Sequence, residues 1–324
     1  MSFKYSQLAW VFSISCIFSC CCLAFDLYGH RGARGLAPEN TLPGFAIALK
    51  HNLDYVDMDV VMSKDGVMVL QHDLSLDPAI TRDERGDWVV SRIPIKFLTL
   101  AELQAFDVGR INPRSVYATY FPDQEAMDGA HIPSLEQAIE YLNEQSGGKI
   151  KFQIEIKSDP VHSNDTFPPE ELAQAVVAII HKQAITDRVE VQSFDWRCLL
   201  EVQNLDARIP TAYLTNNNTE DTMHSSDPKI AGLWTAGYLL KDFNGSIPSM
   251  IKYLGGTLWD PQDITLTQDR LKDAHAQGLK VVTWSTPTTS GKDVTLDLVQ
   301  QQIAMGVDGI ITDRPDRVKL FKTG

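Results

Sequence analysis

The chain has little cysteine beyond its first 24 residues and lacks several short signatures of known chemistry. Of five cysteines, only Cys198 lies outside this segment, which excludes a disulfide framework. There is no Walker sequence, no Cys/His cluster with zinc spacing and no GxSxG elbow. Runs of Lys and Arg are missing too, and 29 basic against 42 acidic residues leave a formal charge of -13. Nucleic acid is therefore excluded as a partner, because such a surface repels phosphate backbones.

The N-terminal segment is typical of a targeting sequence. Residues 8–25 are mostly apolar or small and follow a single positive charge, Lys4. Ala24 suits the end of a cleavage site and Cys20 suits lipoprotein acylation, so both processing routes stay open. A transmembrane anchor is the alternative, but the run is at the short limit for a span. We predict that residues 1–24 are a signal peptide or lipoprotein signal of a secreted or periplasmic protein, with membrane contact only through such an anchor.

Strand and helix patterns alternate through residues 25–324. Apolar strands are expected at 26–30, 55–62, 151–157, 189–193, 211–214, 230–234, 257–259, 280–284 and 309–312. A hairpin strand at 67–71 follows the second strand, and an irregular, proline-containing inserted region spans about 77–131. The stretch 216–228 is expected to be a polar loop. About eight strand–helix units favour a single α/β domain folded as a TIM (β/α)8 barrel with a small insertion after strand 2, a doubly wound open sheet being the alternative.

Charged side chains interrupt strands that otherwise have a buried pattern. Asp57 and Asp59 are two residues apart, so both point to the same face of a strand, and Glu155 and Lys157 repeat this spacing. Three buried carboxylates on neighbouring strands are costly without a cation. A barrel collects such residues at one mouth, where active sites of this fold lie. The spacing therefore predicts a metal site at that mouth.

Two histidines and several basic residues fit the same mouth. His30 ends the first strand and His72 follows the hairpin, so the two could act as acid and base on opposite sides of a substrate. A lone histidine there is more often structural, but the pair together with the carboxylates favours catalysis. Arg31 and Lys157 could bind phosphoryl oxygens, and so could Arg34, for which a plain surface position is an equally good interpretation.

Two residues at the ends of late strands have less decisive patterns. Trp284 could stack on a substrate or fill the core, and we keep it as a candidate substrate-binding residue. Asp313 is interpreted as the cap of the turn that follows the last strand.

Taken in order, the short motifs of the chain resemble those of the glycerophosphodiester phosphodiesterase family. They are HRG at 30–32, PENT at 38–41, DMDV at 57–60, SKDG at 63–66, HD at 72–73, EIK at 155–157, QSF at 192–194 and GVDGIITDRP at 306–315. The resemblance covers about residues 26–315. Each string alone is weak evidence, but their order and spacing together are specific.

The resemblance implies a TIM barrel enzyme that hydrolyses glycerophosphodiesters to glycerol 3-phosphate and an alcohol. It also implies one divalent metal ion, usually calcium or magnesium. By position, the implied metal ligands are Asp57, Asp59 and Glu155. The implied acid/base pair is His30 and His72, and the implied phosphate-binding residues are Arg31 and Lys157.

One residue departs from the family pattern, which usually has Glu at the position of Asp57. The shorter side chain withdraws its oxygens by one carbon–carbon bond, about 1.5 Å. A flexible calcium shell tolerates this gap better than a strict magnesium octahedron, so calcium is slightly favoured.

Two other functions stay open. A lysophospholipase D-like enzyme acting on lipid head groups would need an apolar groove, for which the sequence offers Phe97, Tyr117, Tyr120 and Phe121. The other alternative is a non-catalytic protein that binds glycerophosphodiesters, which is favoured if Asp57 in place of Glu prevents metal binding. In each case the partner is a small molecule, and the sequence does not determine the oligomeric state.

Overall fold

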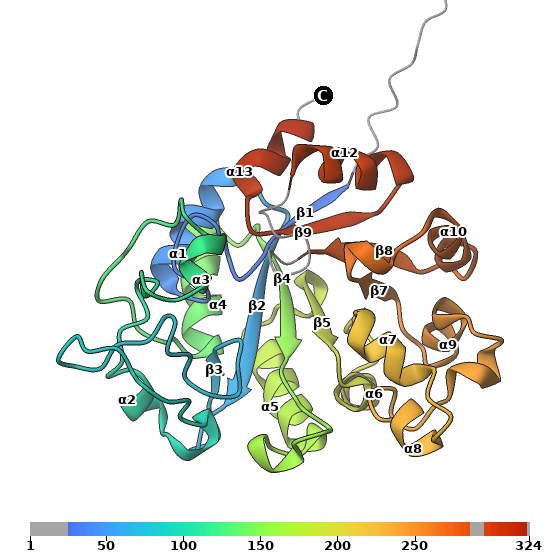
Figure 1. Cartoon of the computed structure of the whole chain (residues 1–324), viewed down its shortest axis with the longest axis horizontal. Helices are drawn as coiled ribbons and strands as arrows, with labels where there is room; N and C mark the ends of the chain where they lie inside the picture. Colours follow the sequence, from blue (N-terminus) through green and yellow to red (C-terminus); the bar gives the residue numbers. More distant parts are fainter. Residues whose placement is uncertain (1–24, 286–294, 323–324) are drawn as a thin grey trace, which may run out of the picture.

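An eight-stranded parallel barrel forms the body of the protein (Figure 1). The computed structural model describes residues 25–285 and 295–322. The barrel strands are β1 Asp26–Gly29, β2 Tyr55–Met62, β4 Lys151–Ile156, β5 Val189–Ser193, β6 Thr211–Thr215, β7 Leu258–Pro261, β8 Lys280–Trp284 and β9 Gly309–Thr312. Each strand pairs in parallel with the next, and β9 pairs with β1, which closes the barrel. The predicted TIM barrel is confirmed.

Helices connect the strands and cover the outside of the barrel. They are α1 Leu42–Ala48, α4 Leu135–Ser146, α5 Pro169–Lys182, α6 Trp196–Leu205, α7 Asn217–Met223, α8 Pro228–Ala231, α9 Ile247–Tyr253, α10 Gln268–Ala276, α12 Leu296–Met305 and α13 Pro315–Val318. In α5, Leu172, Ala173, Val176, Val177 and Ile180 are buried, the spacing of a helix with one apolar face. Among residues 25–285 and 295–322, no helix has both the length and the apolar character to span a bilayer. The predicted targeting segment, residues 1–24, lies outside the described residues.

The barrel has separate apolar layers outside and inside the sheet. The larger core lies between the strands and the helices, and it includes Phe45, Phe152 and Trp196. Inside the barrel, a smaller cluster is formed by Tyr28, Tyr55, Ala212, Leu258, Val282 and Ile311, with Trp284 packed against it. This inner cluster fills the barrel below its carboxyl-terminal end, so polar side chains further along the strands collect at that end.

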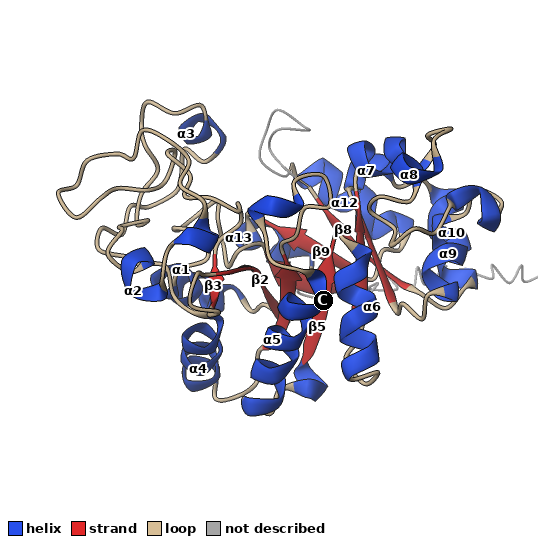
Figure 2. Cartoon of the chain, turned by 90° about the horizontal axis from the view of Figure 1, so that it is seen from below, coloured by secondary structure: helices blue, strands red, loops and turns tan. Residues whose placement is uncertain are grey.

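A long segment after β2 leaves the barrel and packs at its side (Figure 2). It begins with β3 Met68–Leu70, which pairs antiparallel with β2 as the hairpin pattern predicted. The predicted inserted region, about 77–131, lies within this segment and contains α2 Leu100–Leu103 and α3 Tyr117–Tyr120. Its own small core holds Leu76, Ile95, Leu103, Val108 and Ile132 against Val61 and Val69.

The prediction is wrong for residues 216–234. The expected polar loop contains α7, and the expected strand at 230–234 begins in α8. Asn216 and Thr219 form a reciprocal capping box at the start of α7, and the Asp227 side chain caps α8. These side chains satisfy the first backbone N–H groups of a helix. Ile230 is also 46% exposed, so it lacks the burial that would favour a strand.

A buried acid–amide pair lies inside the barrel, on β4 and β7. Gln153 Nε2 donates to Asp260 Oδ2 at 2.9 Å. Gln153 Oε1 and Asp260 Oδ1 are buried and have no hydrogen-bond partner within the described part of the chain. Burial, with Glu190 and Asp57 nearby, raises the pKa of Asp260 well above its usual value. A protonated Asp260 can donate a hydrogen bond. An ionised Asp260 cannot, and both Gln153 Oε1 and Asp260 Oδ1 then remain buried acceptors without a donor.

We therefore expect Asp260→Asn to stabilise the protein at pH 7 by about 1–3 kcal/mol. A carboxyl whose pKa is raised by folding loses stability as pH rises from its unfolded pKa toward its folded pKa, and an amide is free of this loss. Thermal unfolding of both proteins at pH 7 and pH 4 measures the effect. The stability difference should shrink at pH 4, where the unfolded chain also begins to hold the proton. A less stable variant at pH 7 would contradict the interpretation.

Candidate active site

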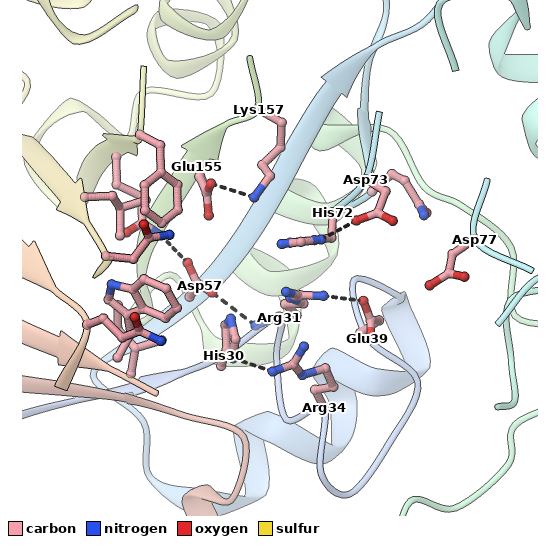
Figure 3. A pocket seen from close by; sticks show the side chains of 18 of the residues that line it. His30, Arg31, Arg34, Glu39, Asp57, His72, Asp73, Asp77, Glu155 and Lys157 are labelled. Atoms are coloured by element: carbon pink, nitrogen blue, oxygen red, sulfur yellow. Dashed lines mark hydrogen bonds and ion pairs between the residues drawn. The ribbon is translucent and has the colours of Figure 1, made fainter. Parts of the chain in front are cut away.

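A cavity of about 590 Å³ lies at the carboxyl-terminal ends of the barrel strands. Figure 3 shows side chains that line it, which come from the barrel strands, the loop between β1 and α1, and the segment after β3. Seven of the eight predicted site residues line this cavity, namely His30, Arg31, Asp57, His72, Glu155, Lys157 and Trp284. The eighth, Asp59, is 1% exposed and contacts the side chains of Arg31 and Lys157.

The loop after β1 is folded tightly so that its residues enter the cavity. Gly32 has φ of +91°, and a Cβ there would lie 2.8 Å from the ring of Phe45, so only glycine fits. Asn40 then fastens the loop to β2, because its Nδ2 donates to Asp59 Oδ2 at 2.9 Å and its Oδ1 accepts from the Asp59 backbone N at 3.2 Å. Asn40 thus shapes the site by buried hydrogen bonding.

His30 is held by a buried carboxylate at the end of β9. Its Nδ1 lies 2.7 Å from Asp313 Oδ1. Asp313 also accepts from Arg34 Nε at 2.9 Å and from Arg34 Nη2 at 2.8 Å, and these positive groups hold the pKa of Asp313 well below its usual range. An ionised Asp313 fixes the proton of neutral His30 on Nδ1, which leaves Nε2 as an acceptor. Burial lowers the pKa of His30, so the ring is neutral near pH 7.

His72 has a similar partner from its own loop. Its Nδ1 lies 2.6 Å from Asp73 Oδ1, and Arg92 Nη1 donates to Asp73 Oδ2 at 2.5 Å. Burial and the positive charges of Arg31 and Lys157 lower the pKa of His72 to about 4, although 36% of its side chain is exposed. Both predicted catalytic histidines are therefore neutral rings with a carboxylate at Nδ1.

The three predicted metal-ligand carboxylates lie together, but they do not titrate alike. Burial raises the pKa of Asp57 well above its usual value, and repulsion from Asp59 and Glu155 adds to this. Burial likewise raises the pKa of Glu155 to about 7. Burial opposes ionisation of Asp59 as well, but the charges of Lys157 and Arg31 outweigh it and keep the pKa of Asp59 well below 3.8. The site therefore carries more carboxyl groups than its own cations neutralise.

Basic side chains complete this cluster. Lys157 Nζ lies 2.6 Å from Glu155 Oε1 and 3.6 Å from Asp59 Oδ1, so its ammonium group sits between the two carboxylates. Arg31 Nη1 donates to Glu39 Oε1 at 2.7 Å, and Arg31 Nε lies 3.3 Å from Asp59 Oδ2. Both predicted phosphate-binding cations line the cavity, each anchored by carboxylates behind it.

The donor set suits a hard divalent cation, although the side chains are not arranged as a metal centre. Among residues 25–285 and 295–322, no three His, Cys, Asp or Glu side chains surround a common point as ligands do. The reason is local: Lys157 lies between Glu155 and Asp59, and Asp57 Oδ1 accepts from Gln192 Nε2 at 2.6 Å. Carboxylate oxygens are nonetheless the donors that calcium and magnesium prefer.

Aromatic side chains form part of the cavity lining. Trp284 lines it from the end of β8, with its Nε1 donating to the Asp260 carbonyl oxygen at 3.0 Å and its ring edge-on to Phe194. Tyr117, Tyr120 and Phe121 of the inserted segment also line it. Phe97, which we expected beside them, is 60% exposed and is not part of the lining.

The residues that orient the predicted catalytic and metal-binding side chains were not predicted from the sequence. Asp313, interpreted as a turn cap, is the partner of His30, 283 residues away in the chain, and of Arg34, 279 residues away. Gln192 binds Asp57 across the barrel, and Asp73 orients His72. The motifs containing Asp73, Gln192 and Asp313 were the available signal, but the contact of Asp313 with His30 depends on the pairing of β9 with β1.

Comparison with known proteins agrees with this geometry. A model of the glycerophosphoryl diester phosphodiesterase family matches residues 30–317. A glycerophosphodiester phosphodiesterase of Bacillus altitudinis is 27% identical over 291 residues, covering 90% of this chain and 95% of its own length. Another, of Bacillus subtilis, is 25% identical over 303 residues, covering 91% and 85%.

Solved structures show the same architecture. A Silicibacter pomeroyi protein with a provisional assignment as a glycerophosphoryl diester phosphodiesterase has a TM-score of 0.79 and 32% identity, covering 92% of each chain. An Oleispira antarctica phosphodiesterase, solved in complex with the product sn-glycerol-3-phosphate, has a TM-score of 0.65 at 21% identity and covers 92% of this chain and 97% of its own. The latter likeness is one of fold. The chain belongs to the glycerophosphoryl diester phosphodiesterase family and is an enzyme of that class.

Proposed function

We propose that the protein hydrolyses glycerophosphodiesters to glycerol 3-phosphate and an alcohol, using two histidines and a divalent cation. One observation carries this proposal: His30 and His72, each bound to a carboxylate at Nδ1, line the same cavity as Asp57, Glu155, Arg31 and Lys157. A phosphodiester reaction needs proton transfer at two oxygens and positive charge at the phosphoryl group. These side chains supply both requirements in one place.

The histidines would transfer protons through their Nε2 atoms. With Nδ1 bound to Asp313 or Asp73, each neutral ring leaves Nε2 free to accept a proton. One ring removes the proton of the nucleophile, which is water or the neighbouring hydroxyl of the glycerol. The other ring first takes up a proton on Nε2 from solvent, becoming an imidazolium, and then gives that proton to the departing alkoxide, while the base ring returns its proton to solvent after turnover. Asp313 and Asp73 are positioning residues, because they fix the tautomer and stabilise the ring while it carries the extra proton.

The basic side chains would hold the phosphoryl oxygens. Arg31 offers several N–H donors and Lys157 a compact ammonium group, and both line the cavity. Asp57, Asp59 and Glu155 would hold the cation, which supplies Lewis-acid stabilisation of negative charge when bound. Calcium remains slightly favoured over magnesium because Asp57 is shorter than the Glu usual in the family.

We also propose that the enzyme acts outside the cytoplasm. Support comes from the sequence of residues 1–24, with its apolar stretch after Lys4 and its Ala24 and Cys20. Whether the signal is cleaved after Ala24 or the chain is acylated at Cys20, the barrel begins a few residues later, at Asp26 of β1. An acyl anchor on Cys20 would therefore place the amino-terminal end of the barrel near the membrane and turn the cavity away from it.

The test of the proposed function is a substrate panel with and without chelator. Purified protein should release alcohol and glycerol 3-phosphate from glycerophosphocholine, glycerophosphoethanolamine and glycerophosphoglycerol, and EDTA should abolish turnover. Calcium and magnesium are then added back separately. Absence of turnover with every diester and both metals would reject the proposal. An acylated substrate, lysophosphatidylcholine, belongs in the panel because Tyr117, Tyr120 and Phe121 line the cavity. Faster turnover of that lipid would favour the lysophospholipase D-like alternative.

A further inference from the structure

The cavity has two walls of different chemistry. One wall consists of the uncharged side chains of Leu214, Trp284 and Ile311 on β6, β8 and β9, with Phe194 directly after β5. From the inserted segment come Asp77, Ile80, Tyr117 and Tyr120, which we call the insertion wall. In Figure 3, Asp77 lies on the far side of His72 and Glu39 from Asp57 and Glu155. The proposed phosphate-binding region thus lies between the two walls.

Asp77 differs from Glu39 and Asp73, the acids nearest to it in the cavity lining, because no basic side chain binds it. Glu39 is paired with Arg31, and Asp73 is paired with His72 and Arg92. The Oδ1 atom of Asp77 accepts only from the Ala79 backbone N, at 2.8 Å. Within the described part of the chain, no Lys, Arg or His forms an ion pair or hydrogen bond with Asp77. Arg92 acts on Asp77 only through its charge and is bound to Asp73 instead, so the carboxylate of Asp77 is open to a ligand in the cavity.

Two tyrosine rings line the same wall as Asp77. Tyr117 is fixed in place, since its hydroxyl group hydrogen-bonds to Glu39 and Arg34 and its ring packs edge-on against Phe121. Tyr120 packs edge-on against Tyr117 and is partly exposed to the cavity. The electron-rich faces of such rings attract cations, and ammonium groups with methyl substituents most of all. Asp77, Tyr117 and Tyr120 thus place one carboxylate and two aromatic rings on the same wall, and such a combination can bind a cation.

We propose that the insertion wall binds a positively charged amino-alcohol head group, so that the preferred diesters carry choline or ethanolamine. The proposal rests on the proposed function of the same cavity. Arg31 and Lys157 attract the phosphoryl group and repel a cationic head group. Asp77 and Tyr120 attract the ammonium group on the other side. The uncharged barrel residues suit the glycerol part, which gains nothing from Asp77. Asp77 and Tyr120 are then specificity residues for the leaving alcohol.

The experiment compares kcat/KM for three diesters among four proteins. The diesters are glycerophosphocholine, glycerophosphoethanolamine and the uncharged-head-group diester glycerophosphoglycerol. The proteins are the wild type, Asp77→Asn, Tyr120→Leu and Asp87→Asn. Asparagine at position 77 keeps an oxygen to accept from Ala79 N, so the turn is preserved while the charge is removed. Asp87 is the matched control, because it is an exposed acid of the same inserted segment that does not line the cavity.

The wild type should prefer the two cationic diesters. Asp77→Asn should lower kcat/KM for these by about tenfold, equivalent to about 1.4 kcal/mol, and change the glycerol diester less than about twofold. Tyr120→Leu should have its largest effect on the choline diester, and Asp87→Asn should alter none. Equal losses on all three diesters, unchanged selectivity in Asp77→Asn, or a wild type that prefers the glycerol diester would each overturn this inference while leaving the proposed function intact. No turnover of any diester by the metal-loaded wild type would instead reject the proposed function.

Discussion

Replacing His30 or His72 with glutamine should lower kcat by about 10²–10⁴-fold while the protein stays folded. Glutamine can still donate a hydrogen bond toward Asp313 or Asp73, but it cannot accept and return a proton. The loss should appear in kcat more than in KM, because proton transfer occurs in the transition state. Steady-state kinetics with glycerophosphocholine measures the effect, and circular dichroism checks the fold.

A matched control is available on the surface. His275 Nε2 lies 2.9 Å from Asp308 Oδ2, so it also belongs to a histidine–carboxylate pair, but it does not line the cavity. His275→Gln should retain wild-type kcat. Full activity in His30→Gln or in His72→Gln would remove that ring from the acid/base pair. Equal losses in all three variants would point to a general structural effect.

The barrel was predictable because its signal is local and repeated. Strands such as Lys280–Trp284 and Gly309–Thr312 are short, mostly apolar runs, and caps or glycines mark the helices between them. The wrong prediction of secondary structure for residues 216–234 also comes from a local pattern. Asn216 and Asp227 form side-chain caps that start helices without an apolar run, and a weak apolar pattern at Ile230 suggested a strand instead.

The sequence predicts which residues make up the candidate site, but it does not predict which of them bind one another. Alternation places Asp57 and Asp59 on one face of β2, and barrel geometry brings Glu155 beside them in register. The partners of His30 and Asp57 come from distant segments, whereas His72 is bound by the next residue, Asp73. Asp313 reaches His30 only because β9 pairs with β1, and Gln192 reaches Asp57 across the barrel. No local pattern encodes these distances.

The position of Asp57 shows how a departure from the family pattern is accommodated. Its Oδ1 accepts from Gln192 Nε2 at 2.6 Å and its Oδ2 from the Arg31 backbone N at 3.1 Å. Both oxygens are thus already bound by neutral donors, and burial raises the pKa of the group. Glu155 lines the same cavity and has a pKa of about 7, so it is poised to release its proton when a cation approaches. Glu155 is therefore the more informative position for testing the metal site.

Glu155→Gln should weaken binding of calcium and magnesium by at least about tenfold and reduce kcat/KM by about 10²–10³-fold. An amide oxygen remains in place, but the negative charge that attracts the cation is removed. Metal binding is measured without turnover: a metal that binds only the folded state raises the unfolding temperature, and at a given metal concentration the rise is larger the tighter the metal binds. The wild type should show this shift on addition of calcium, and Glu155→Gln should show little of it.

Glu190→Gln is the matched control for this experiment. Glu190 is also a buried barrel carboxyl, on the adjacent strand β5, but it accepts from the Tyr28 hydroxyl at 3.1 Å and does not line the cavity. Burial raises the pKa of Glu190, as it raises that of Glu155, so the two variants make the same chemical change at buried carboxyl groups. This variant should keep both the calcium-dependent shift and the activity. If Glu155→Gln retained the full shift, the cation would have to bind elsewhere, and the carboxylates of β2 and β4 would lose their assignment as its ligands.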